Sequence, residues 1–372
     1  MSGLYVHIPF CKSKCLYCDF YSLPHLSGAG TYVEALLAEW RLRRHEVPMP
    51  IATVYLGGGT PSVLTAGQLC RLVAGLPMGD EVGERTIEVN PDDVTPELVK
   101  TIVALGFNRV SMGVQSFNDQ ELRFVNRRHT AAQAVEAVHA LQAGGVGNIS
   151  IDLIYGLPLQ SLESWQRSVE MAVSLGVQHI SAYNLTYEEG TPLWRMRERG
   201  AVAEADDETC IAMFDLLIDK LAAAGFEHYE ISNFALPGFH SRHNSSYWDG
   251  TPYLGLGAAA HSYDGTTRSA NPPDIHRYID AIAAGRVACE RETLQWWERH
   301  DEDVMLRLRT SQGIDTGLLA SRYGEPVAAL FEKKAARFVE QGLMSRDATR
   351  YRLTRRGILL SDSMIAHLLW DR

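Results

Sequence analysis

Three cysteines near the start of the 372-residue chain constrain it more than any other feature. Cys11, Cys15 and Cys18 follow directly on residues 4–10, a β-branched and aromatic segment that is typical of a strand. Thiolates this close in one loop can bind one inorganic centre. A closed zinc site uses four protein ligands, and an iron–sulfur cubane is usually held by four cysteines. A cubane held by only three would keep one iron open for a ligand that is not protein, and this is the interpretation that we favour.

Two other interpretations of the loop account for fewer of its residues. A zinc site with three cysteines and one histidine would take His7 or His25 as its fourth ligand. A redox dithiol made by Cys15 and Cys18 would leave Cys11 without a role. Structural disulfides are not expected, because we recognise no secretory signal and expect a cytoplasmic protein.

Overall charge and hydropathy argue against two broad classes of protein. The formal net charge is −10 and the isoelectric point is about 5.7, so we expect no general binding of nucleic acid. No run of 18 or more apolar residues occurs in the sequence, so we do not expect an integral membrane protein. The length is sufficient for one large α/β domain and a smaller second one.

Strand-like and helix-like segments alternate six times along the first 225 residues. The expected strands cover residues 4–10, 53–56, 86–90, 109–114, 149–154 and 179–185, and the expected helices cover residues 31–46, 67–76, 95–106, 130–144, 161–175 and 206–224. Strict alternation predicts a parallel sheet with helical crossovers. Polar residues follow five consecutive strands, as in a barrel whose loops at one end build a single site. We therefore predict an α/β fold with a curved, partial, TIM-like barrel.

The alternation stops in the stretch that follows. Residues 227–274 are rich in glycine, histidine and aromatic side chains, and we expect irregular structure that closes over the open side of the barrel. A helix is expected over residues 275–284, after two prolines.

From about residue 300 the pattern is typical of a small α+β domain. Helices are expected over residues 302–309, 317–323 and 327–341, a hairpin over 343–346 and 351–353, and a last helix from residue 358. This order resembles a winged helix. Residues 301–372 hold 12 Lys and Arg against 10 Asp and Glu, so a lid or docking role is favoured over DNA binding. The predicted domains are residues 1–235, 236–299 and 300–372.

Polar residues at the predicted strand ends suit a ligand site. Residues 57–61 (GGGTP) lack the lysine of a phosphate-binding loop, but glycines allow close backbone approach to a ligand. Glu88 and Asp152 lie among apolar neighbours and need partners. These partners are either the hydroxyl or cationic groups of a ligand, or a structural ion pair with Arg85 or Arg109.

Two more features suggest binding chemistry. Arg127, twelve residues after Gln115, would bind a carboxylate with its guanidinium, or it is a solvated charge beside Arg123 and Arg128. Residues 243–248 (HNSSYW) place a histidine near two large aromatic side chains. This combination suits haem with a histidine ligand, although a histidine in irregular structure is more often only hydrogen-bonded.

Together these motifs resemble the HemW haem chaperones, relatives of oxygen-independent coproporphyrinogen III oxidase in the radical S-adenosylmethionine (SAM) superfamily. The resemblance spans essentially the whole chain and is carried by the three cysteines with residues 5–10, and by residues 57–61, 88, 113–117, 152–158, 243–248 and 255–262. It implies a partial (β/α)6 TIM-like radical SAM barrel with a small C-terminal winged-helix-like α+β domain. It also implies a [4Fe–4S] cluster on Cys11, Cys15 and Cys18 whose open iron takes SAM.

The same resemblance implies further binding residues. By analogy with the oxidase, the contacts to the cluster-bound SAM are Tyr5, Gly58, Glu88 and His261. The residues that match positions lining a second SAM in the oxidase are Tyr17, Gly59, Thr60, Gln115, Arg127, Asp152 and Thr186. The haem candidates are His243, Asn244, Tyr247 and Trp248. No catalytic residue is assigned.

Two departures from the oxidase favour the chaperone branch. The oxidase has a further cysteine two residues after the third, where this chain has Phe20, and it carries an extension ahead of the first strand. The implied function is haem binding and delivery to an acceptor haemoprotein, for which a respiratory, membrane-associated protein is one candidate, with an electron donor for the cluster. The alternative is the decarboxylation of porphyrin propionates, so enzymatic activity is left open.

Overall fold

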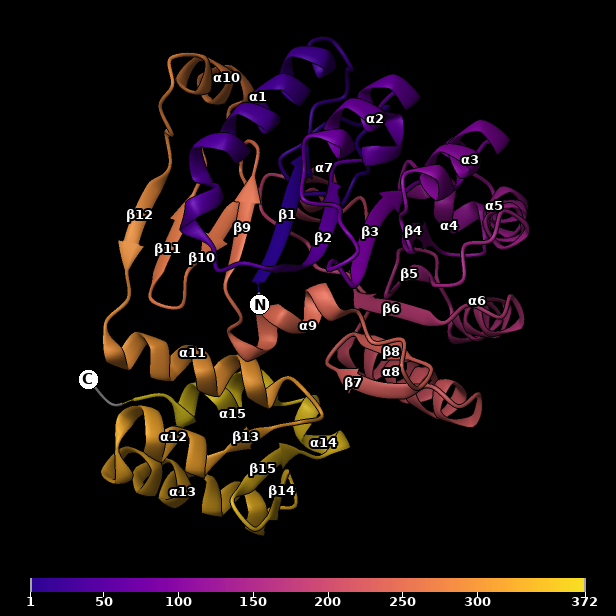
Figure 1. Cartoon of the computed structure of the whole chain (residues 1–372). Helices are drawn as coiled ribbons and strands as arrows, with labels where there is room; N and C mark the ends of the chain where they lie inside the picture. The colour runs from indigo at the N-terminus through magenta and orange to yellow at the C-terminus, as the bar shows by residue number, and fades with distance from the viewer. Residues whose placement is uncertain (1, 371–372) are drawn as a thin grey trace.

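The computed structural model describes residues 2–370, which form a curved sheet wrapped by helices and a smaller C-terminal unit (Figure 1). Six strands at the centre of the sheet run parallel and pair in chain order. They are β1 (Ser2–Ile8), β2 (Ile51–Gly58), β3 (Glu84–Val89), β4 (Arg109–Gln115), β5 (Ile149–Tyr155) and β6 (His179–Asn184). The predicted barrel-like α/β fold is confirmed, and the strand boundaries agree within a few residues.

Helices connect successive strands and cover the outer face of the sheet (Figure 1). They are α1 (Ala29–Arg43), α2 (Ala66–Ala74), α3 (Pro96–Ala104), α5 (Ala131–Ala143), α6 (Leu162–Ser174) and α8 (Asp207–Ala223), with single turns η1 (Arg44–Glu46), η2 (Pro61–Val63) and η3 (Pro91–Asp93). The side chains of Thr95 and Thr130 cap α3 and α5. Two short helices, α4 (Asp119–Phe124) and α7 (Pro192–Glu198), were not predicted, because so few residues show no clear period.

The expectation of irregular structure over residues 227–274 is wrong. The segment and its continuation contain β7 (Glu227–Glu230), β8 (Asn233–Ala235), α9 (Arg242–Asp249), β9 (Tyr253–Leu256), β10 (His261–Tyr263), β11 (Thr267–Ala270), α10 (Ile275–Ala283) and β12 (Glu290–Thr293). β9 pairs with β1 as a seventh parallel strand. β8 pairs antiparallel with β6 at the opposite end of the barrel. These strands have only three or four residues each, so their alternation is too short to read from the sequence.

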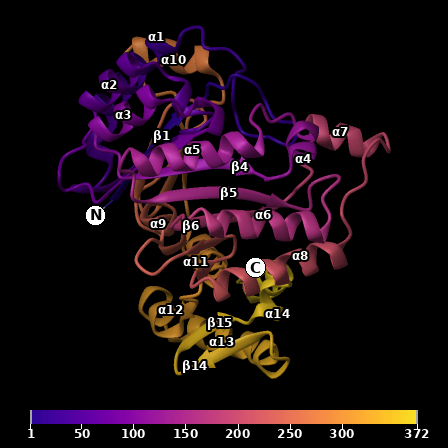
Figure 2. The same ribbon diagram turned by 90° about the vertical axis from the view of Figure 1, so that its right-hand side faces the viewer.

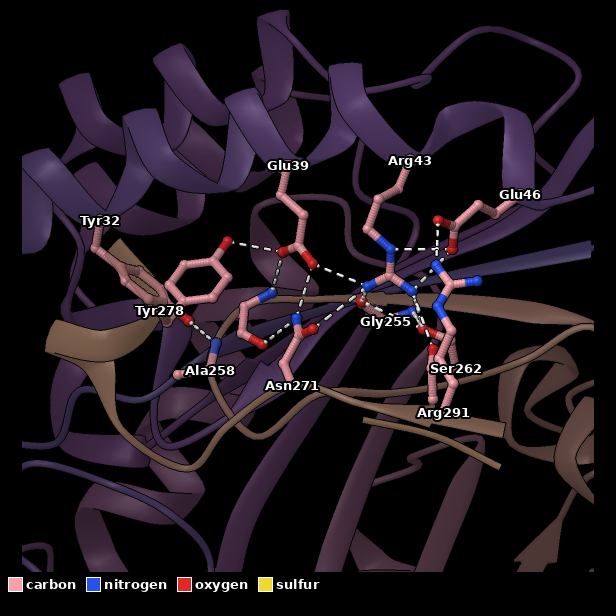
Figure 3. Close-up of polar contacts among 12 residues, drawn as sticks. Tyr32, Glu39, Arg43, Glu46, Gly255, Ala258, Ser262, Asn271, Tyr278 and Arg291 are labelled. Carbon is pink, nitrogen blue, oxygen red and sulfur yellow. Dashed lines mark hydrogen bonds and ion pairs between the residues drawn. The ribbon is translucent and has the colours of Figure 1, made fainter. Parts of the chain in front are cut away.

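A buried polar network joins α1 to this added part of the sheet (Figure 3). Arg43 Nη1 lies 2.9 Å from Glu39 Oε1, and Arg43 Nη2 donates to the hydroxyl of Ser262 at 3.2 Å. Glu39 also accepts hydrogen bonds from the amide of Asn271 at 2.7 Å and from the backbone N–H of Gly257 at 2.8 Å. A buried ion pair is tolerated when hydrogen bonds satisfy its remaining atoms. The network therefore fixes β9, β10 and the turn between them against α1.

The C-terminal unit has its own hydrophobic core, which includes Leu308, Phe331 and Tyr351. Its elements are α11 (Trp296–Leu308), β13 (Ile314–Asp315), α12 (Thr316–Tyr323), α13 (Glu325–Glu340), β14 (Met344–Asp347), β15 (Arg350–Leu353), α14 (Arg355–Ile358) and α15 (Ser361–Leu368). The three strands form one antiparallel sheet beside the helices. This confirms the predicted winged-helix-like arrangement, although the first helix begins earlier than expected.

The C-terminal unit packs beside α8, as Figure 2 shows. Arg355 contacts α8 through the carboxylates of Asp215 and Asp219, each at 2.6 Å. Within residues 2–370, none of the helices combines the length and the apolarity needed to cross a bilayer.

Strand β1 turns its apolar side chains outwards to the helices and its polar side chains inwards. In β1, Leu4, Val6 and Ile8 are fully buried in the main core, and Tyr5 and His7 alternate with them. The Tyr5 hydroxyl lies 3.0 Å from His7 Nδ1 inside the barrel. We call the N-terminal ends of β1–β6 the barrel floor and their C-terminal ends the barrel mouth. Both levels carry polar groups.

Candidate functional site

One cavity of about 1250 Å³ opens at the barrel mouth and extends along α8 to the C-terminal unit. Most of the predicted site residues line it: Cys11, Cys15, Tyr17, Cys18, Gly58, Gly59, Thr60, Glu88, Gln115, Arg127, Asp152, Thr186 and Trp248. The other predicted residues, which do not line it, are Tyr5, His243, Asn244, Tyr247 and His261. Residues from loops that are far apart in the sequence therefore line a single cavity.

The cysteine loop follows β1 and is fixed by backbone hydrogen bonds at its start. The N–H of Cys11 donates to Leu23 O at 2.9 Å, and Lys12 pairs with Asp93 of η3 at 2.5 Å. Burial raises the pKa of the Cys11 thiol and raises that of Cys18 to about 11. Without metal these two thiols are protonated at neutral pH, so metal binding must release protons.

Both histidines near this loop already have a hydrogen-bond partner in the protein. His7 Nε2 lies 3.0 Å from Tyr21 O, and His25 Nδ1 lies 2.9 Å from the hydroxyl of Ser27. Among residues 2–370, no three side chains of His, Cys, Asp or Glu converge as they would around a single ion. Three thiols that share one open cavity fit a cubane held by three cysteines better than a closed zinc site.

The glycine run after β2 lets that strand end approach the cysteine loop closely. Gly58 has φ of +107°, and a Cβ there would lie 2.5 Å from the ring of His7. A Cβ on Gly59 would lie 2.8 Å from the carbonyl oxygens of Ile8 and Phe10. Glycine is required at both positions because β1 and its loop fill the space of a side chain.

Glu88 lies at the mouth with its two oxygens held separately. Oε1 accepts a hydrogen bond from the Tyr55 hydroxyl at 2.7 Å, and Oε2 accepts one from the Gly58 N–H at 3.1 Å. Burial, helped by the charge of nearby Asp152, raises the pKa of Glu88 to about 7 against the opposite effect of these two hydrogen bonds. A cationic ligand group would favour the ionised form.

Asp152 lies on β5, two strands along the sheet from Glu88 on β3, and lines the same cavity. The hydroxyl of Ser111 is 3.4 Å from both carboxylate oxygens of Asp152. Burial raises the pKa of Asp152. Within residues 2–370, no salt bridge of 4 Å or less joins Arg85 or Arg109 to either carboxylate. Both carboxylates therefore face the cavity without the ion pair that was their structural alternative.

Arg127 is not the solvated charge of the alternative interpretation. Its Nη1 lies 3.4 Å from Cys15 Sγ, and its Nη2 donates to Asn90 Oδ1 at 2.7 Å and to Gly113 O. Asn90 also donates to the hydroxyl of Thr60 at 3.0 Å. Sequence reasoning missed Asn90, although its place directly after β3 was a usable signal. These contacts place a guanidinium beside the cysteine loop, where it lines the cavity.

The haem candidates lie on α9, which packs against the barrel floor. The backbone N–H groups of Arg242 and His243 each donate to Glu84, the first residue of β3, at 2.8 Å. His243 Nδ1 lies 2.8 Å from the Thr53 hydroxyl, and Nε2 lies 2.8 Å from that of Tyr247. Burial lowers the pKa of His243 to about 3, with a smaller effect from Arg109. This histidine is neutral, with both ring nitrogens bonded inside the protein.

The other candidates on α9 do not share one environment. Trp248 lines the cavity, whereas the ring of Tyr247 packs edge-on against His243 and Tyr253. Tyr5, predicted as a SAM contact, stacks on His243 inside the barrel. His261, the other predicted contact outside the cavity lining, is exposed at the start of β10.

Comparisons with known proteins agree with this geometry. The radical SAM superfamily matches residues 5–172, and the HemN C-terminal domain matches residues 294–360. The fold is similar to that of coproporphyrinogen III oxidase (HemN) from Escherichia coli, with a TM-score of 0.84, 24% identity, and coverage of 98% of this chain and 89% of that chain. The superfamily implies a [4Fe–4S] cluster and SAM. The three thiols, the carboxylates and the guanidinium around the cavity fit both groups.

Similarity to named relatives extends over the full length. Several of them carry the name heme chaperone HemW. The protein from Lactococcus lactis is 34% identical, covering 100% of this chain and 98% of its own. The one from Mycobacterium tuberculosis is 37% identical, covering 99% and 94%. The one from Bacillus subtilis is 33% identical, covering 100% of both. The chain therefore belongs to the HemW family of the radical SAM superfamily.

Proposed function

We propose that this protein binds haem and passes it to an acceptor haemoprotein, and that the cluster and SAM in the barrel control the transfer. The observation that carries the proposal is the full-length similarity to relatives named heme chaperones, at 33–37% identity. A fold shared with the oxidase does not decide between chaperone and decarboxylase, because one fold serves several functions.

The position of Phe20 supports the chaperone over the decarboxylase. Phe20 stands where the oxidase has its further cysteine, lines the cavity beside Cys18, and is 64% exposed. A phenyl ring offers no thiol to a reaction but does offer apolar surface to a large ligand. The change thus removes a reactive group at the barrel mouth and adds a hydrophobic one.

The residues of the chain have separate roles in this proposal. Cys11, Cys15 and Cys18 hold the cluster, which when bound supplies an electron for cleavage of the C–S bond of SAM. Glu88 receives the positively charged part of the ligand, and Arg127 binds a carboxylate. Each of these side chains is held in place by protein contacts before the ligand arrives, which lowers the entropic cost of binding.

For haem itself we propose a contact with Trp248 rather than ligation by His243. Trp248 is the one haem candidate that lines the cavity. Ligation by His243 would require Nε2 to leave Tyr247 and the helix to separate from the barrel floor. In this proposal His243 positions α9, and Asn244 and Tyr247 belong to the same support.

The remaining partners follow from the proposed role. The cluster needs an electron donor, and the haem needs an acceptor haemoprotein, with a respiratory, membrane-associated protein as one candidate. We place the protein in the cytoplasm. Its net charge of −10 gives no support to nucleic acid as a partner.

The proposal is tested by titrating anaerobic, cluster-loaded protein with haem and following the absorbance, in parallel with a turnover assay on coproporphyrinogen III. We expect stoichiometric haem binding and no decarboxylated product. Turnover without stable haem binding would assign the protein to the oxidases instead.

The control by the cluster is tested with the haem-loaded protein and an apo-haemoprotein acceptor. Cluster-free Cys15→Ala protein should transfer haem at a different rate from the cluster-loaded wild type with SAM. Cys70→Ala, at an exposed position outside the loop, is the matched control. Equal transfer rates for all three proteins would contradict control by the cluster.

A further inference from the structure

The cysteine loop and the strand ends form one wall of the cavity. A second wall is formed by other residues, and the proposed binding of the cluster and SAM gives these residues no role. This wall lies between α8 and the junction of α14 and α15. It carries three large apolar side chains that remain exposed, Ile211 at 40%, Leu359 at 39% and Leu360 at 50%. Phe20 and Tyr183, also exposed, line the same cavity. Apolar groups gathered in one concave surface mark a binding site more than scattered ones do.

The size of the cavity leaves room for a second ligand. Small-molecule pockets are typically about 300–1000 Å³, and this cavity measures about 1250 Å³. The cluster and SAM would occupy the end at the barrel mouth, where the cysteines, Glu88 and Arg127 lie. The wall along α8 belongs to the other end, which the cofactors of the superfamily do not account for.

Two guanidinium groups accompany the apolar surface. Arg356 lines the cavity and is exposed, and its side chain makes neither a hydrogen bond nor an ion pair within residues 2–370. Arg309 also lines it and pairs with Asp362 through Nη2 at 2.6 Å, but its buried Nε has no partner among the described residues. Guanidinium groups bind carboxylates with two parallel hydrogen bonds. The wall thus combines a broad apolar face with the guanidinium of Arg356, unpaired among the described residues, and with that of Arg309, which a ligand carboxylate would share with Asp362 at the same cavity.

We propose that haem binds on this wall, with its porphyrin ring against Ile211, Leu359 and Leu360 and its two propionates at Arg356 and Arg309. The inference rests on the proposed function and adds the location of the ligand. Haem is flat and apolar with two carboxylates on one edge, which matches the chemistry of the wall. The site lies between the barrel and the C-terminal unit, so movement of that unit would expose or release the ligand.

The test compares haem with haem dimethyl ester, which lacks the carboxylates, in titrations of cluster-loaded wild type, Arg356→Gln and Arg309→Gln. Wild type should bind haem more tightly than the ester. Arg356→Gln should weaken haem binding about tenfold, the size of one charge-assisted hydrogen bond, and leave binding of the ester unchanged. Arg352→Gln, on the same unit but outside the cavity lining, should bind both ligands as wild type does.

The apolar face is tested separately with Leu360→Asp. This change should weaken the binding of haem and of the ester alike. Leu159→Asp is the matched control, because Leu159 is 68% exposed and does not line the cavity. Thermal melting of every variant identifies any that fails to fold, and either arginine variant alone suffices for the comparison.

The possible outcomes separate this inference from the proposed function. Haem binding by wild type with no preference over the ester, or with unchanged affinity in both arginine variants and Leu360→Asp, would overturn the location and leave the chaperone function standing. A wild type that binds neither ligand would overturn the proposed function and the location with it.

Discussion

The barrel floor and the barrel mouth are both polar, but their polar groups are satisfied in different ways. At the floor, Glu84 accepts hydrogen bonds from two backbone N–H groups of α9, and both ring nitrogens of His243 have hydrogen-bond partners. At the mouth, Glu88 and Asp152 have few contacts and face a large cavity. Polar groups that satisfy one another stabilise a fold, whereas polar groups that face a cavity are available to a ligand.

Arg109 is an exception to this contrast, because it is a polar group near the floor with nitrogens that lack partners within residues 2–370. Its side chain is 1% exposed at the start of β4, and its Nε and Nη1 have no partner among the described residues. Its charge lowers the pKa of His243 at the floor and opposes the rise in the pKa of Glu88 and Asp152 at the mouth. One buried cation therefore acts on both levels and favours the ionised carboxylates that a ligand would meet.

The largest expected effect on stability is found by comparing two Glu→Gln substitutions in β3, one at the barrel floor and one at the barrel mouth. Glu84→Gln should lower the free energy of unfolding by about 2–3 kcal/mol, because the new NH2 group faces a backbone N–H and leaves it unpaired. Glu88→Gln should change it by less than about 1 kcal/mol at pH 7, because the Tyr55 hydroxyl can reverse its hydrogen bond. Urea denaturation at fixed pH measures both values.

The result also bears on ligand binding. Glu88→Gln should weaken SAM binding, while Glu84→Gln should leave the affinity of the folded protein unchanged. Equal losses of stability in the two variants would contradict the contrast between floor and mouth.

A second prediction concerns pH and isolates Glu88. Its pKa is about 7 in the folded protein and about 4.3 in an unfolded chain. The folded state therefore binds the proton more tightly, and the stability that this supplies is complete below about pH 4.3 and is lost as pH rises through 7. Between pH 5 and pH 8, wild type should lose about 1–3 kcal/mol more than Glu88→Gln.

Comparing wild type with Glu88→Gln cancels the contributions that the other titrating groups make to the pH dependence of stability. Glu230, whose burial also raises its pKa to about 7, and His129 and His243, whose burial lowers theirs to about 3, titrate in both proteins. Urea denaturation at several pH values gives the difference directly. Parallel curves for wild type and variant would show that Glu88 does not bind its proton more tightly when folded.

The sequence predicted the mouth well because strand ends carry a clear signal. Period-2 and helical patterns locate the strands, and polar residues at their carboxyl ends must lie together once the sheet is parallel. Cys11, Glu88, Arg127 and Asp152 were found in this way or by the resemblance, and they do line one cavity.

The floor and the second wall were not predictable for physical reasons. The buried residues of α9 are His243 and Ser246, so the helix has no apolar stripe and its period is invisible to hydropathy. Arg356 and Ile211 are far apart in the chain and line one cavity only after the C-terminal unit packs on α8. Contacts of this kind depend on tertiary packing, which local patterns do not record.

The smallest expected effects come from two hydroxyl groups, one at each level. Thr53→Val should cost about 1–2 kcal/mol, because it leaves the buried Nδ1 of His243 without its partner at 2.8 Å. Ser111→Ala should cost less than about 0.5 kcal/mol, because its contacts to Asp152 are long, 3.4 Å each, and water in the cavity can replace them. Thermal and urea unfolding of both variants measure the difference. A larger loss for Ser111→Ala than for Thr53→Val would mean that the mouth, too, is held together by its own polar contacts, and its carboxylates would then be less available to a ligand than we infer.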